Sequence, residues 1–510
     1  MLFPLNPDSF RHKSSRTRRD SEYWKGEVLE AFLKPGCSVC VKTLDSLDRY
    51  FFWFIHEQYN AAETRRALRC SHGFCPLHTR HFLTQEASWC ARPVYSYVVE
   101  HIVARLREAQ SLLCISGKNE DPRKRCLAAA AALAPSGNCP VCENLAWWRA
   151  HMANILLQTL SDREVEEAYV KSQGLCLPHL RLVGMRAGWE RLLFLTDHIR
   201  GALTSLKYST DKIGLPLEVI AGLDVNRLVR SSEETVRGLP GGAREKSTDV
   251  LALLARPACP ACAACDRGVG EYFQWLAGEM EAVASRAGPW DPSWSVCASH
   301  LWDLQSAGHD RAAATISDQT CRVWISQIEN LKARLETRQP DRLLDRLAGL
   351  PSAWSRSKGQ ETTGEIRSKF NRLWHVTATT LESPAKVLDR LREVHFRESP
   401  CQACSHVEVT ARRTIDLVLR ALEGPIGREA YHRGAGLCFR HCLVAANLAE
   451  VPDVLAELFS SQLARLRLLE WELEEASRKM NWVIRYEPKG PEETSWRRAA
   501  YQLCGSALSV

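Results

Sequence analysis

Residues 139–179 read CPVCENLAWWRAHMANILLQTLSDREVEEAYVKSQGLCLPH. The segment opens with a Cys-x-x-Cys pair, Cys139 and Cys142, and closes with a Cys-x-x-His pair, Cys176 and His179. Thiolates and an imidazole at such spacings are the usual ligands of a bound metal ion. The segment therefore predicts a metal site with three sulfur ligands and one nitrogen ligand.

The same pattern occurs four times in the chain of 510 residues. The distance from the second cysteine to the third is 35, 34, 35 and 34 residues in the four copies. We expect the two pairs of each copy to form one site, with ligands Cys37, Cys40, Cys75 and His78; Cys139, Cys142, Cys176 and His179; Cys259, Cys262, Cys297 and His300; and Cys401, Cys404, Cys438 and His441. Each such site would close a loop of one copy.

Apolar residues recur every three or four positions after each ligand pair, which is typical of amphipathic helices. In copy two they are Leu145, Trp148, Met152, Leu156 and Leu160. Strand-like alternation is scarce. The sequence therefore predicts an all-α protein with four tandem helical units, each organised around its own metal site.

The connections between the copies vary in length, and this variation suggests where the units begin and end. We predict a basic N-terminal tail (1–24), unit 1 (25–135), unit 2 (136–208), a linker (209–248), unit 3 (249–339), a linker (340–364), unit 4 (365–480) and a C-terminal tail (481–510).

We expect the ligand pairs to lie at helix N-termini. Each pair precedes an apolar period, and Pro140 and Pro260 stand where the first turn of a helix tolerates proline. Free backbone N–H groups and the helix dipole stabilise thiolates at such positions.

The composition is that of an ordinary globular protein, with 45% apolar and 25% charged residues and a formal net charge of +7. This charge is small for the length and does not by itself call for a nucleic acid or an anionic membrane. The first residues contain no apolar segment typical of a secretory signal, and we expect a cytoplasmic protein whose 20 cysteines stay reduced.

Three thiolates and one imidazole match a closed, structural zinc site, and we expect four zinc ions per chain. Iron–sulfur clusters with Cys3His ligation are the main alternative and would make the protein an electron carrier with up to four clusters. A thiol-redox Cys-x-x-Cys is a third interpretation, but it does not explain the coupled Cys-x-x-His. No phosphate loop, G-x-S-x-G elbow or H-E-x-x-H helix occurs, so the sequence offers no positive sign of an enzyme.

Further cysteines lie near three of the expected sites, namely Cys70, Cys265 and Cys442. Because no such extra residue recurs in all four copies, we interpret them as local variation. Six tryptophans lie within helical apolar stretches and are expected in the core: Trp53, Trp148, Trp189, Trp275, Trp324 and Trp471.

Two features resemble motifs of an uncharacterised group of bacterial proteins. One is the CPxC pair of copies two and three, and the other is the glycine before the Cys-x-x-His of copies one, two and four. In that group a CPxC is followed by a glycine-led C-x-x-H in a helical context. The resemblance implies a bacterial source and no known reaction. Ser38 and Gln402 replace the proline in copies one and four, and copy three lacks the glycine.

Together these features predict a non-catalytic zinc protein whose helical modules act as a scaffold or adaptor, with another protein as the expected partner. A nucleic-acid-binding zinc protein is an alternative that would require a basic stripe across the modules. The partner, the pathway and the oligomeric state do not follow from the sequence.

Overall fold

The computed structural model describes residues 18–114, 121–208, 217, 221–223, 250–284, 296–336 and 401–505. Within these residues the regular elements are helices, and no strand occurs, which confirms the all-α prediction. None of the described helices combines the length and the apolar character needed to span a bilayer.

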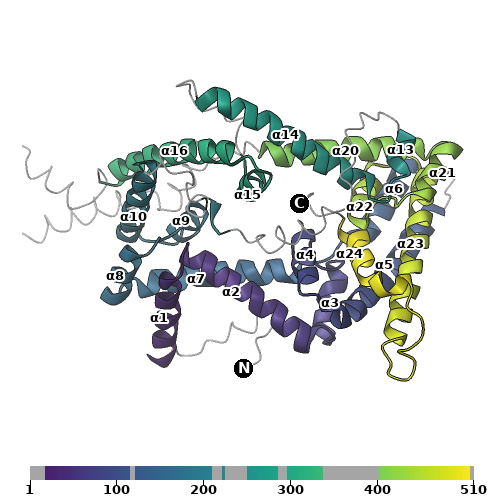
Figure 1. Cartoon of the computed structure of the whole chain (residues 1–510), viewed down its shortest axis with the longest axis horizontal. Coiled ribbons are helices and arrows are strands. Elements are labelled where there is room, and N and C mark those ends of the chain that lie inside the picture. Colours follow the sequence, from purple (N-terminus) through teal and green to yellow (C-terminus); the bar gives the residue numbers. More distant parts are fainter. Residues whose placement is uncertain are drawn as a thin grey trace, which may run out of the picture.

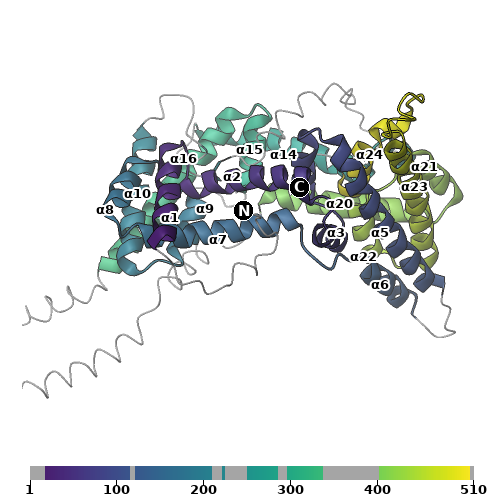
Figure 2. The same ribbon diagram turned by 90° about the horizontal axis from the view of Figure 1, so that it is seen from below.

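Two long helices form the framework of the first half of the chain. Helices α2 (Ser38–Trp53) and α7 (Pro140–Thr159) lie side by side along their lengths (Figures 1 and 2). The Ser46 hydroxyl contacts the Asn144 side chain at 3.3 Å, which pairs the middle of α2 with the start of α7. Farther along α2, Tyr50 comes close to Cys139, which directly precedes α7, so the two helices are antiparallel and their N-termini lie at opposite ends of the pair.

The second half of the chain repeats this arrangement with α14 (Pro260–Ala284) and α20 (Gln402–Ala421). The Cys265 thiol donates to the Val407 carbonyl at 3.4 Å, whereas Tyr272, farther along α14, lies near the start of α20, with its ring 4.9 Å from that of His406 and close to Cys401. This pair is also antiparallel, and it runs alongside α2 and α7 on the other side of the molecule (Figure 1).

Both helix pairs connect the same two lobes. We call the first lobe the helices α3 (Ala62–Cys70), α4 (Pro76–Thr84), α5 (Ser88–Cys114), α6 (Pro122–Leu133), α13 (Val250–Leu254), α21 (Pro425–Arg433), α22 (Phe439–Leu448), α23 (Pro452–Arg478) and α24 (Ser495–Cys504). The second lobe contains α1 (Arg18–Leu33), α8 (Arg163–Lys171), α9 (Leu177–Gly184), α10 (Trp189–Tyr208), α15 (Ala298–Ser306) and α16 (Asp310–Glu336). The two lobes occupy opposite ends of the molecule (Figure 1).

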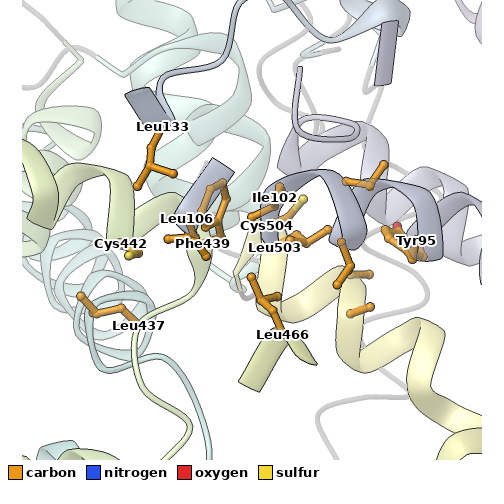
Figure 3. Packing of buried hydrophobic residues seen from close by; sticks show 14 of the residues in the cluster. Tyr95, Ile102, Leu106, Leu133, Leu437, Phe439, Cys442, Leu466, Leu503 and Cys504 are labelled. Carbon is orange, nitrogen blue, oxygen red and sulfur yellow. The ribbon is translucent and has the colours of Figure 1, made fainter. Parts of the chain in front are cut away.

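Each lobe has its own hydrophobic core, and each core draws on both halves of the chain. In the first lobe α5 packs along α23, and Ile102 and Leu106 on the one helix and Leu466 on the other are fully buried in the same cluster (Figure 3). In the second lobe α10 packs along α16. The helices that follow the Cys-x-x-His pairs of copies one and four therefore share one core, and those that follow the pairs of copies two and three share the other.

The structure corrects two sequence-based expectations. Residues 495–504, expected within a C-terminal tail, form α24, because Trp496, Ala499 and Leu503 recur at helical spacing and are buried in the first lobe. Trp275 and Trp471, expected in the core, are 48% and 58% exposed, since each points away from the face by which its helix packs. The segment 340–364 and nearly all of 209–248, predicted as linkers, lie outside the described residues.

The packing between α5 and α23 leads to a stability prediction. Replacing the fully buried Leu106 by alanine should lower the free energy of unfolding by about 2–5 kcal/mol, through lost burial and the cavity left behind. Leu33→Ala at a position that is 88% exposed is the control and should change it by less than about 0.5 kcal/mol. Denaturant titrations of both variants measure the difference, and equal effects would contradict the packing described.

Candidate metal centres

Every ligand pair of the sequence opens a helix, as expected. Seven of the eight leading cysteines occupy the N-cap position of a helix: Cys37, Cys75, Cys139, Cys176, Cys297, Cys401 and Cys438. The eighth, Cys259, directly precedes α14, which begins at Pro260. None of the seven N-cap cysteines caps its helix with a side-chain hydrogen bond. The sulfurs therefore lie at the positive end of a helix dipole, where a thiolate is stabilised.

The sixteen side chains come together in four groups of three cysteines and one histidine, and the ligand atoms of each group lie within 4.8 Å of one another. We name them group A (Cys37, Cys40, Cys176, His179), group B (Cys75, His78, Cys139, Cys142), group C (Cys259, Cys262, Cys438, His441) and group D (Cys297, His300, Cys401, Cys404).

The expected pairing within each copy is wrong. The Cys-x-x-Cys of copy one joins the Cys-x-x-His of copy two, and the reverse exchange completes the second group. Copies three and four exchange their pairs in the same way. No group of four combines the two ligand pairs of one copy. Each group therefore connects two copies.

Helix lengths explain the exchange. From Ser38 the chain runs through α2 and the π-helical turn Phe54–Gln58, 21 residues that rise about 30 Å. The next helix, α3, has only 9 residues and returns about 14 Å, so the following Cys-x-x-His stays near the far end of α2. Because α7 is antiparallel to α2, its N-terminus with Cys139 and Cys142 lies at that end.

The distances within the groups are those of a tetrahedron of ligands around one ion. One sulfur–sulfur distance in each of groups A, B, C and D is 3.7, 3.7, 3.8 and 3.9 Å, respectively. The sulfurs approach the histidine Nδ1 atom to between 3.2 and 3.5 Å in all four groups. Zinc bonds of about 2.3 Å to sulfur and about 2.0 Å to nitrogen give tetrahedral edges of about 3.8 Å between sulfurs and about 3.5 Å between sulfur and nitrogen. All 20 cysteines are free thiols.

The pKa values of the cysteine thiols in the groups also favour a bound cation. Hydrogen bonds from the other sulfurs of the group lower the pKa of Cys75 and Cys262 far below the usual range, and they lower the pKa of Cys401 to about 3. The neighbouring Cys139 and Cys438 donate these hydrogen bonds, so their pKa values are raised. One sulfur of the group thus ionises readily, and a second negative charge within 4 Å requires a compensating cation.

The backbone conformation explains why glycine occupies the turn before three of the Cys-x-x-His pairs. Gly73, Gly174 and Gly436 have φ values of +96°, +70° and +69°, a region that favours glycine. A Cβ atom at Gly174 would also lie 2.6 Å from the ring of His198. These turns deliver the third cysteine to the start of its helix. In copy three the corresponding residues 290–295 lie outside the described part of the chain.

Two further glycines, which the sequence analysis did not single out, contact the sulfurs. Gly222 has a φ of +80°, and a Cβ atom there would lie 3.0 Å from the Cys40 sulfur. Gly505 has a φ of +84°, and its Cβ atom would lie 2.6 Å from the Cys262 sulfur. No motif marks either position, because each glycine belongs to a distant segment that only the fold brings to its group.

The three additional cysteines stay outside the groups. Cys442 is fully buried in the core of the first lobe, and the Cys265 thiol is occupied by its hydrogen bond to a backbone carbonyl. Cys70 ends α3, and its carbonyl accepts from the N–H groups of Ser136 and Gly137. None of the three residues is among the ligands of a group.

A model described as a family of unknown function (DUF6062) matches residues 27–190 of the 510. The matched span holds the first two copies with the whole of groups A and B. Comparisons with curated proteins and with solved structures give no match. The chain is thus similar to an uncharacterised family over its first two copies, and this similarity brings no activity with it.

Proposed function

We propose that this protein is a non-catalytic zinc protein in which groups A to D each bind one zinc ion and the resulting rigid helical frame serves as a scaffold for another protein. The observation that carries the proposal is the convergence, in every group, of three sulfurs and one Nδ1 atom within 4.8 Å. Four ligands of this type complete the coordination of zinc and leave no position for a substrate.

The ligand spacing supports a single ion over a cluster. A cluster places several iron and sulfide atoms between its ligands and holds them farther apart than one ion does. Sulfur–sulfur distances of 3.7–3.9 Å suit ligands that share one ion. Among single ions, zinc combines a preference for tetrahedral sulfur and nitrogen ligands with the absence of redox chemistry.

The position of the groups supports a structural role. Groups A and B lie at the two ends of the helix pair α2 and α7, and groups C and D lie at the two ends of α14 and α20. Each ion would tie the start of a long helix to a helix from the neighbouring copy. Both connections between the lobes would therefore be held at each end, which keeps the frame rigid.

An exposed apolar surface supports a scaffold role. Leu468 and Trp471 on α23, with Trp482 and Tyr486 in the turn beyond it, are 56%, 58%, 74% and 80% exposed. Large apolar side chains that stay this exposed are candidates for contact with another protein. We further propose that the protein works in a reducing compartment such as the cytosol, since its ligand thiols must stay free of disulfides.

Elemental analysis of the protein purified without oxygen tests the proposal. We expect about four zinc ions per chain and a colourless protein, because zinc has no visible absorption. Since structural zinc contributes roughly 10–16 kcal/mol in small peptides, removing all four ions should abolish cooperative thermal unfolding. Iron with matching sulfide would overturn the zinc scaffold in favour of an electron carrier, and cycling disulfides without metal would favour a thiol-redox protein.

A further inference from the structure

The four groups differ in how well the protein covers their sulfurs. In group A the exposed fractions of Cys37, Cys40 and Cys176 are 3%, 6% and 1%. In group C, Cys262 and Cys438 are 0% and 2% exposed, and Cys259 is half-buried. In group B, Cys139 is buried, Cys75 is half-buried and Cys142 is exposed. All three cysteines of group D are half-buried.

A separate turn of the chain covers group A. Gly222 lies directly on the sulfurs, because a Cβ atom there would come within 3.0 Å of Cys40 and 3.4 Å of Cys176. Its carbonyl accepts a hydrogen bond of 3.3 Å from the Trp302 indole on α15, and the backbone N–H of Leu223 donates to the Cys40 sulfur. The turn is thus anchored on both sides and shields the sulfurs from solvent.

Group C has an equivalent cover from the end of α24. A Cβ atom at Gly505 would lie 2.6 Å from the Cys262 sulfur and 3.1 Å from the Cys438 sulfur. The preceding residue, Cys504, holds the end of α24 in place through contacts with the Thr79 hydroxyl at 3.1 Å and the Phe74 carbonyl at 3.3 Å. None of the glycines of the described chain approaches the sulfurs of groups B and D in this way.

We propose that the sites are of two classes: groups A and C hold their ions permanently, whereas groups B and D exchange theirs with external thiolate or aminocarboxylate ligands. This inference rests on the proposed zinc binding. In the exchange, a donor atom of the incoming ligand forms a bond to zinc from the uncovered side. One zinc–sulfur bond then breaks, and the released thiolate takes a proton from water. No oxidation state changes in this step. Repeating the step with the remaining ligands transfers the zinc ion to the new ligand.

Zinc release to excess EDTA, followed with a zinc-sensitive dye, tests the division into classes. We expect two of four ions to leave at least about tenfold faster than the other two. Cys142→Ser should remove one of the two fast ions and leave both slow ions in place. Release of all four ions in one phase would overturn the two classes, whereas a starting protein without four zinc ions would instead overturn the proposed function.

The glycine covers provide a second test with a matched control. Gly222→Ala places a methyl group against the Cys40 sulfur, and we expect a third ion to become fast. Gly308→Ala has a similar strain, with φ at +86°, but a Cβ atom there meets nothing within 4 Å, so two fast and two slow ions should remain. Trp302→Phe keeps an aromatic ring but removes the indole N–H that donates to Gly222, and it should shift the same ion if the alanine variant does not fold. A third ion that stays slow in the folded variants would contradict the proposed cover.

Discussion

Replacing Cys40 and Cys176 together by serine should remove one zinc ion from the protein, whereas replacing Cys40 and Cys75 together should remove two. The first two residues belong to group A, so the double change destroys a single site. The second pair lies within one copy of the repeat, but its members belong to groups A and B. Native mass spectrometry counts the ions retained by each double variant.

The energetic contrast between the two variants should also be large. Structural zinc contributes roughly 10–16 kcal/mol in small peptides, which equals or exceeds the net stability of about 5–15 kcal/mol of a typical domain. Loss of both group A and group B would free both ends of the pair α2 and α7, so we expect a much lower melting temperature than after the loss of group A alone. Cys70→Ser with Cys442→Ser, outside the groups, is the control and should retain four ions. If the variant with both Cys40 and Cys75 replaced retained three zinc ions, the two residues would belong to one site, and the exchange of ligand pairs between copies would be contradicted.

Two fragments, residues 1–223 and 250–510, should fold only in each other's presence. The first carries groups A and B complete, and the second carries groups C and D, so each fragment holds all ligands of two sites. Neither fragment holds a complete hydrophobic core, because α5 needs α23 in the first lobe and α10 needs α16 in the second. Each fragment alone would expose the large apolar faces of two lobes.

Co-expression and size-exclusion chromatography with light scattering test this dependence. We expect a stable complex with one copy of each fragment and cooperative unfolding, which neither fragment shows alone. Leu106→Asp in the first fragment places a charge in the shared core and should prevent the association, whereas Leu127→Asp at a position that is 45% exposed should not. Fragments that are separately monomeric and cooperatively folded would contradict the shared cores.

The local features of the sites followed from the sequence because they depend on neighbours in the chain. The spacing of the cysteines and histidines identified all sixteen residues that the structure gathers, and the apolar periods after them predicted the helices that they open. The glycines before three Cys-x-x-His pairs indicated turns, and these residues have positive φ values. None of these features requires knowledge of a distant segment.

The partners of each ligand pair could not be predicted in the same way. All four Cys-x-x-Cys pairs are chemically equivalent, as are the four Cys-x-x-His pairs, so spacing alone does not say which of them meet. A constant separation of 34 or 35 residues suggests that each copy forms a loop closed by one ion. However, a long helix followed by a short one carries the Cys-x-x-His pair away from the Cys-x-x-Cys pair of the same copy.

The sequence by itself determined the residue types, the helices and the position of every ligand pair at a helix start, since these depend on interactions between residues close in the chain. Only the tertiary structure decided which pairs share a group, which copies share a core and which groups Gly222 and Gly505 cover. The physical reason is that antiparallel packing of long helices sets these contacts, and such packing depends on apolar surfaces from both halves of the chain acting together.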